Sequence, residues 1–268
     1  MLGNITIGQY VGGDSFLHRT DPRTKIIAAI ITMAAIFIMA DIISYIVFAA
    51  VLLFVILICR IPVKYTLRGL RPIFFLILFT VVINLFTIKG IVVLDLGFAS
   101  ITEEGIYTAV RLALRLILLV ISASMLTLTT TPINLTDGIE RLLMPLSRLG
   151  FPGHEIALMM TIALRFIPTL VEETDKIMKA QKSRGADFES GNLIKRAKSF
   201  LPVLVPLFVN SFKRADDLAV AMEARGYRGG KGRTRLKELH FTFTDLRFAF
   251  SLLFTLTCIM ILDKLILG

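Results

Sequence analysis

The chain has 268 residues, of which 55% are hydrophobic and 19% are charged, and its mean hydropathy is +0.77. A soluble globular enzyme needs a more polar surface than this composition allows. The long apolar runs exclude a disordered chain, the glycines lack the period of collagen, and two cysteines are too few for a disulfide scaffold. The net charge of +10 suits either nucleic acid or the cytoplasmic loops of a membrane chain. The composition therefore predicts a membrane protein.

The apolar residues form five runs that can become membrane helices, at 26–40, 42–59, 73–88, 106–128 and 248–262. No apolar core precedes them, so no cleavable signal peptide is expected. A spanning helix needs about 20 residues, so the shorter runs must borrow flanking residues, tilt or pack on protein. We expect an all-α membrane protein with about five transmembrane helices. The expected regions are 1–128 with four membrane helices, a cytoplasmic helical region at 129–244, and a last transmembrane helix at 245–268.

Lysine and arginine set the expected orientation, because they gather in cytoplasmic loops. They are frequent before the first run and between the second and third, as Arg19, Arg23, Lys25, Arg60, Lys64, Arg68 and Arg71. The alternate connections, at residue 41 and at 89–104, are poor in cations. Residues 129–244 carry eighteen Lys and Arg against twelve Asp and Glu, a net charge of +6. We expect a multi-pass protein with its N-terminus in the cytoplasm and its C-terminus outside the cell.

Arg111 and Arg115 lie four residues apart on one face of the fourth run. A buried arginine in a membrane is costly and is therefore a candidate functional residue. Both also lie near the start of that run, where they can snorkel to the outer interface or pair with Glu103 or Glu104. We favour the second interpretation and leave their function open.

The cytoplasmic region predicts two helices of the same design. In the first, residues 156–164 are apolar on all sides and residues 171–182 are amphipathic and charged. Pro168 lies near the change of character and is expected to kink the helix. In the second, the apolar stretch 200–212 precedes the charged stretch 213–225. The architecture is therefore duplicated.

Both helices are expected to end in a small residue, an arginine and a glycine: Ser183, Arg184, Gly185 and Ala224, Arg225, Gly226. Glycine commonly ends a helix and a cation there complements the helix dipole, so each triplet by itself is typical of a cap. An arginine at a helix tip can also make bidentate contacts with carboxylates or carbonyls in a groove. Because the ending occurs twice, we favour docking knobs, which can be caps as well.

The apolar halves of these helices hold more hydrophobic side chains than a small solvated segment can bury. The candidates for contact are Leu143, Met144, Met159, Met160, Leu204 and Leu207. They are expected to pack on one another, on lipid or on another membrane protein. Methionines suit a surface that accepts several partners, although filling gaps is the commoner reason for a methionine.

Motifs for catalysis and metal binding are missing from the sequence. Residues 226–234 lack the Walker A spacing, and Leu158 stands where a zinc motif that begins at His154 needs its second histidine. We therefore expect no catalytic residue and no metal site. The basic run 225–237 has one tyrosine for stacking and precedes a membrane helix, so it predicts an inner-leaflet loop and no nucleic-acid partner.

The stretch at 15–25, SFLHRTDPRTK, resembles the opening signature of the transmembrane (T) component of energy-coupling factor (ECF) transporters, a family that includes the cobalt-transport Q protein. Asp21 suits an N-cap, with Pro22 at the first helical position. The element at 165–168, RFIP, and the two arginine-glycine ends resemble the same family. The residues of the signature are His18, Asp21, Pro22, Arg23, Lys25, Arg165 and Pro168. Ser183 departs from the alanine usual at that position, but it is also small.

This resemblance implies a non-catalytic subunit of a bacterial cell-membrane importer for a vitamin or a transition metal. It implies two cytoplasmic ATPases, which bind ATP and Mg²⁺, and a small substrate-binding membrane protein, the S component. The chain itself is expected to bind no cofactor. Residues 183–185 and 224–226 correspond to the motifs that dock into the ATPases. The apolar halves correspond to the coupling helices that contact the S component.

Two other functions remain open on the residues alone. An ordinary permease forms its own substrate path and wants polar residues along the spans, where Asn84, Arg111, Arg115 and scattered hydroxyls are available. A membrane-embedded lipid-modifying enzyme wants clustered carboxylates or histidines, which the sequence lacks. We favour the scaffold.

Overall fold

The computed structural model describes residues 10–95, 100–145, 152–188, 190, 192–229 and 241–267, most of them helical. The chain divides into two compact units. One, here called the bundle, comprises residues 8–142 and 239–268. The other, here called the helix pair, comprises residues 1–7 and 143–238.

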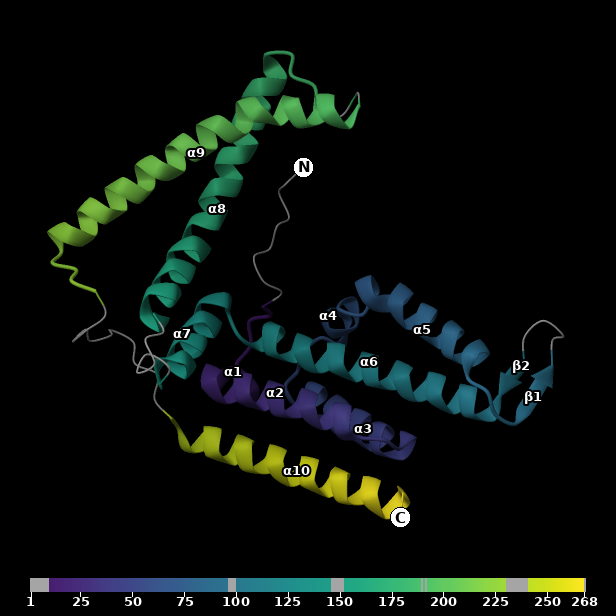
Figure 1. Cartoon of the computed structure of the whole chain (residues 1–268). Helices are drawn as coiled ribbons and strands as arrows, with labels where there is room; N and C mark the ends of the chain where they lie inside the picture. The colour runs from purple at the N-terminus through teal and green to yellow at the C-terminus, as the bar shows by residue number, and fades with distance from the viewer. Residues whose placement is uncertain are drawn as a thin grey trace. The chain divides into compact units, whose positions relative to one another are not determined.

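The bundle is built around its longest helix, α6 (Glu103–Thr129). The remaining helices of the bundle are α1 (Phe16–Arg19), α2 (Pro22–Ile38), α3 (Ile42–Ile58), α4 (Val63–Arg68), the 3₁₀ turn η1 (Arg71–Ile73), α5 (Phe74–Thr87), α7 (Pro132–Leu143) and α10 (Phe243–Leu267). Helix α6 packs against α2, α3, α4 and α5, and α10 packs against α2 and α3 (Figure 1).

Two hydrophobic clusters form the core of the bundle. The first joins α2, α3, α6 and α10 through Ile36, Met39, Tyr45, Phe48, Leu118, Leu256 and Ile259. The second joins α1 to the end of α3 and the end of α6 through Leu17, Ile56, Cys59, Ile61, Met125 and Leu128. Cys59 is thus a small buried hydrophobe, as its apolar sequence context indicates.

Four helices in the described part of the chain are long and apolar enough to cross a membrane: Val63–Thr87, Glu103–Thr129, Gly153–Ser183 and Phe243–Ile266. Ile42–Ile58 is a shorter apolar helix. An all-α membrane protein is therefore confirmed. Two details differ from the expectation. The first predicted run belongs to a helix of 17 residues, α2, and the predicted cytoplasmic helix Gly153–Ser183 meets the criteria of a span because its first half is so apolar.

Helix α10 runs parallel to α2, and carboxylates near its two ends hold it there. Asp245, in the first turn of α10, accepts the N–H of Asp21 at 2.7 Å, just before α2 begins. Asp263, near the other end of α10, accepts the N–H of Ala40 at 3.2 Å and that of Asp41 at 2.9 Å, just after α2 ends. The two helices therefore start at the same end of the bundle.

A small hairpin that the sequence analysis did not predict lies between α5 and α6. Its strands, β1 (Val92–Asp95) and β2 (Ser100–Thr102), pair antiparallel with Val92 opposite Thr102 and Leu94 opposite Ile101, so the register shifts between them. The carboxylate of Glu104 accepts the N–H of Ile91 at 2.9 Å. Strands this short leave too little alternation in the sequence to be recognised.

The helix pair consists of α8 (Gly153–Ser183) and α9 (Leu193–Ala224), which pack on each other. Both contain proline: Pro168 in α8, and Pro202 and Pro206 in α9. Neither helix is interrupted at these positions, and α9 begins before the apolar stretch that revealed it. Figure 1 shows the two helices diverging on either side of their contact.

Candidate functional site

The two arginine-glycine ends of α8 and α9 have the same backbone geometry. At the end of α8, Gly185 N–H donates to Lys182 O at 3.0 Å and Ala186 N–H donates to Gln181 O at 2.9 Å. This pair of bonds is the Schellman motif, with the glycine in the left-handed region at φ +87°.

At the end of α9 the same two bonds recur. Gly226 N–H donates to Glu223 O at 2.8 Å, and Tyr227 N–H donates to Met222 O at 3.0 Å, with Gly226 at φ +72°. The cap interpretation is therefore correct for both glycines. It explains the glycine, but it does not require an arginine at the preceding position.

Both arginines are exposed to solvent, as are the small residues beside them. The side chains of Arg184 and Arg225 make no hydrogen bond or ion pair with any other described residue. A Cβ added at Gly185 or Gly226 meets no atom within 4 Å, so the space around each tip is open. Each tip thus presents a guanidinium, with its donors unused, on a fixed backbone.

All six candidate contact residues are at least partly accessible, but Leu143 ends α7 and Met144 follows it, so only the other four lie in the apolar halves of α8 and α9. Met144, Met159 and Leu204 are 59%, 60% and 44% exposed, Met160 is exposed, and Leu143 and Leu207 are half-buried. The analysis of the sequence missed the larger part of this surface on α9, where further exposed hydrophobics are Leu201, Val205, Phe208, Val209 and Phe212. Leu201 and Phe208 lie three and four residues from Leu204, a helical spacing that could have revealed them.

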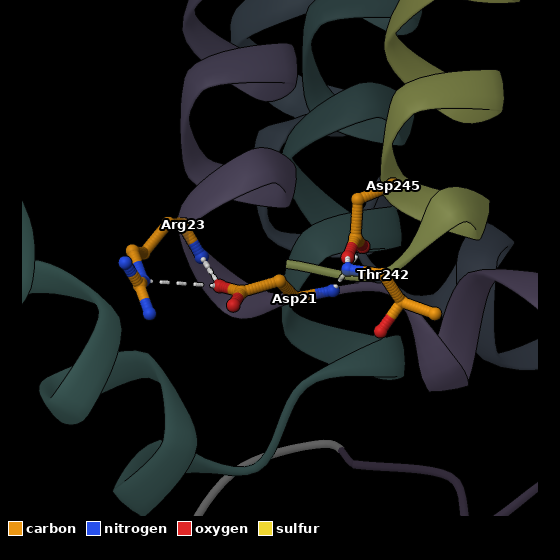
Figure 2. A network of polar contacts seen from close by, with 4 residues as sticks. All are labelled: Asp21, Arg23, Thr242 and Asp245. Atoms are coloured by element: carbon orange, nitrogen blue, oxygen red, sulfur yellow. Dashed lines mark hydrogen bonds and ion pairs between the residues drawn. The ribbon is translucent and has the colours of Figure 1, made fainter. Parts of the chain in front are cut away.

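Five of the signature residues lie together at the start of α2 in the bundle, and the structure adds Thr242 and Asp245 to them. Asp21 caps α2 by accepting the N–H of Arg23 at 2.8 Å, as predicted, and its carboxylate lies 3.4 Å from Arg23 Nε (Figure 2). Asp245 accepts two backbone N–H groups, from Asp21 at 2.7 Å and from Thr242 at 2.7 Å. This network joins the start of α10 to the start of α2.

Lys25 is buried just before the apolar run of α2. Its Nζ donates to His18 O at 3.3 Å, to Thr129 O at 3.0 Å and to Thr130 Oγ1 at 3.4 Å. The lysine therefore ties α1 and the end of α6 to α2.

His18 holds the segment that precedes α1. Its Nδ1 lies 2.6 Å from Ser15 Oγ and its Nε2 lies 2.9 Å from Val11 O. Val11 N–H donates in turn to Leu128 O at 3.0 Å. The other two signature residues, Arg165 and Pro168, are exposed on α8 in the helix pair.

Arg111 and Arg115 bind the turn between α2 and α3. Arg115 donates to Tyr45 Oη at 2.9 Å and to Met39 O at 3.1 Å, and Arg111 donates to Ala40 O at 3.5 Å. Within the described residues neither arginine pairs with Glu103 or Glu104, so that expectation was wrong. Carbonyl groups exposed at the end of α2 satisfy the guanidinium groups instead.

No group of three or more His, Cys, Asp or Glu side chains that could hold a metal ion occurs among the described residues. The charged clusters of the bundle are instead occupied by bonds to the backbone.

Comparisons with known proteins show the family of the chain. A family model described as "Cobalt transport protein" matches residues 13–236. A relative from Ruminiclostridium cellulolyticum, named energy-coupling factor transporter transmembrane protein EcfT, is 59% identical over 245 residues, or 91% of this chain and 92% of its own length. Proteins of the same name from Clostridium kluyveri and Bacillus subtilis are 53% and 47% identical, covering 99% and 91% of this chain and 98% and 93% of their own lengths. The chain belongs to the family of transmembrane components of energy-coupling factor transporters.

Proposed function

We propose that this chain is the scaffold that joins two cytoplasmic ATPases to a substrate-binding membrane protein, so that ATP hydrolysis drives uptake of a vitamin or a transition metal. ATP and Mg²⁺ would bind to the ATPases and not to this chain. The observation that carries the proposal is the repeated tip: two helices end in the same motif, each with an exposed arginine that has no partner among the described residues.

Two equivalent tips suit two similar partners. A planar guanidinium on a fixed backbone can make a bidentate contact with a carboxylate or with carbonyl oxygens in a groove. Each tip is followed by a glycine whose conformation turns the chain away, which leaves the arginine accessible. We therefore assign one ATPase to Arg184 and the other to Arg225.

The exposed apolar surface of α8 and α9 supports a second, different contact. Met159 in α8 and Leu204 in α9 lie about 20 residues or more from the arginine of their own helix, roughly 30 Å along a helix. An exposed apolar surface that includes residues of both helices favours a membrane protein as partner over a soluble one. We assign this surface to the S component.

The parallel course of α2 and α10 supports a cytoplasmic place for α8 and α9. If α2, α3, α5 and α6 each cross the membrane once, a further crossing by α8 alone would make α10 run opposite to α2. For α10 to run parallel to α2, the chain must cross the membrane an even number of times between α6 and α10. No crossing at all agrees with the net positive charge of residues 129–244. The N-terminus would then lie inside and the C-terminus outside.

Cysteine labelling in intact cells tests this topology, in a background with Cys59 and Cys258 replaced by alanine. A cysteine at position 93, exposed in β1, should react with a membrane-impermeant maleimide, and cysteines at 64 and 190 should react only after lysis. Position 41 is buried and makes a poor probe, and position 231 lies outside the described residues. Labelling of position 190 in intact cells would contradict the topology.

The docking assignment is tested by Arg184→Glu and Arg225→Glu, with Lys179→Glu and Lys213→Glu as controls that reverse exposed charges on the same helices. Each arginine reversal should weaken retention of the ATPases on purified transporter by about tenfold or more, and the double variant should lose uptake. The controls should change retention by less than about twofold.

Normal co-purification and uptake in the double variant would reject the docking assignment. Binding of a vitamin or a metal ion to the purified chain alone would favour an ordinary permease instead.

A further inference from the structure

The contact between α8 and α9 contains a polar cluster that the docking proposal does not use. Glu173 of α8 accepts a hydrogen bond from the Asn210 side-chain amide and forms an ion pair with Arg214, with 2.8 Å between Nη2 and Oε2. Asn210 and Arg214 lie four residues apart on one face of α9. The side chain of Glu173 is 16% exposed and that of Arg214 is 34% exposed. A single carboxylate thus binds two positions of the other helix.

The cluster lies at the same distance from both docking arginines. Eleven positions separate Glu173 from Arg184, and eleven separate Arg214 from Arg225. At 1.5 Å per residue each of these segments is about 16 Å long. The segments from this polar contact to the two docking arginines, 173–184 and 214–225, are therefore equal in length. They are here called the arms of α8 and α9.

A second contact holds the start of α9. The buried ring of Phe188, which follows α8, lies 5.2 Å from the ring of Phe200 in α9. Within the part of the chain that the structure describes, the arm of α9 beyond Arg214 makes no side-chain hydrogen bond or ion pair with α8, so the cluster at Glu173 is the last polar contact between the two helices on that side.

We propose that Glu173, with Asn210 and Arg214, is the pivot of the helix pair: it fixes where α8 and α9 cross and thereby the angle between the two arms that end in Arg184 and Arg225. This inference rests on the proposed docking of ATPases at those arginines. Apolar side chains can slide past one another, whereas a carboxylate held by two donors specifies one register.

The pivot predicts a defect in coupling and not in docking. Glu173→Arg places a cation against Arg214 and removes the acceptor for Asn210. In the reconstituted transporter, substrate uptake per ATP hydrolysed should fall by about fivefold or more, while ATPase retention stays within about twofold of wild type. The charge swap Glu173→Arg with Arg214→Glu should restore at least half of the coupling. Glu172→Gln and Lys213→Gln alter exposed neighbours and serve as controls.

The angle itself can be measured by electron paramagnetic resonance on the full chain in nanodiscs, with and without the ATPases. Spin labels at positions 179 and 223, both exposed and close to the tips, would be placed in a background with Cys59 and Cys258 replaced. We expect one narrow distance distribution in the wild type. It should broaden in Glu173→Gln, Glu173→Arg and Arg214→Gln, and narrow again in the charge swap.

An unchanged distance distribution together with unchanged coupling in Glu173→Arg would overturn the pivot. So would a defect that the charge swap does not repair, because that result indicates a local packing fault. Failure of the wild-type chain to retain ATPases would reject the proposed function instead, and the two failures are therefore distinguishable.

Discussion

The charged side chains of the bundle and the arginines at the two tips of the helix pair are used in opposite ways. In the bundle, Asp21, Asp245, Asp263 and Lys25 are buried and bind backbone N–H or C=O groups at the ends of α2, α6 and α10. At the tips of the helix pair, the guanidinium groups are exposed and make no bond with any residue the structure describes.

The difference separates residues that hold the fold from residues that are free to bind a partner. A buried carboxylate or ammonium group that binds backbone groups stabilises the fold, because removing it leaves those groups without a partner in an apolar setting. An exposed arginine without a partner within the described chain contributes little to stability and is accessible to another molecule. The N-terminal signature therefore belongs to the first class, and Arg184 and Arg225 belong to the second.

The largest expected effect is on the bundle. Asp245→Ala removes the acceptor for the buried N–H of Asp21 and the partly buried N–H of Thr242, and it should destabilise the chain by about 3 kcal/mol. Thermal unfolding in detergent should show a lower midpoint and cells should hold less protein. Asp245→Asn keeps an acceptor and should lose less stability. Asp217→Ala, at an exposed carboxylate of α9, should lose almost no stability. If Asp245→Ala left the stability normal but abolished ATPase binding, the network at Asp245 would serve partner binding and not the fold.

A selective effect is expected on the apolar surface of the helix pair. Met159→Asp combined with Leu204→Asp places charge where an apolar contact is proposed, so association with the S component should fall by about tenfold or more. Retention of the ATPases through the distant arginines should persist. Met159→Leu with Leu204→Met keeps the surface apolar and is the matched control. Loss of the ATPases with the S component still bound would show that the division of labour along each helix is wrong.

A smaller effect is expected at the glycines behind the arginines. Gly185→Ala and Gly226→Ala each force a side chain into the left-handed region at a cost of about 1 kcal/mol, although nothing obstructs the added Cβ. The tip should fray and ATPase retention should fall by about fivefold. Gly229→Ala imposes the same strain at φ +86° outside either helix end, so it should leave retention unchanged. If all three variants lost ATPase retention equally, the two helix tips would not be the docking sites.

The local features of the candidate site could be predicted from the sequence. The capped start of α2 at Asp21 and Pro22, the apolar and charged halves of α8 and α9, and the glycine stops at 185 and 226 depend on neighbouring residues in the chain. Such features follow from turn chemistry and from the helical repeat, which a sequence displays directly.

The partners of the charged groups could not be predicted in this way. Of the alternatives weighed for Arg115, pairing with a nearby glutamate was wrong, because Arg115 binds Tyr45 and Met39, which are 70 and 76 positions away. The hairpin between α5 and α6 was not recognised either, because its strands are too short to show an alternating pattern.

The sequence by itself determined that this is a helical membrane protein with two similar helices that end in an arginine and a glycine, because composition, helical periodicity and capping are properties of short stretches. Only the tertiary structure decided that Asp245 meets Asp21 across 224 positions and that Glu173 binds Asn210 across 37. A carboxylate in a sequence has many possible donors. Which of them it meets depends on how the helices pack, and packing is set by contacts between segments far apart in the chain.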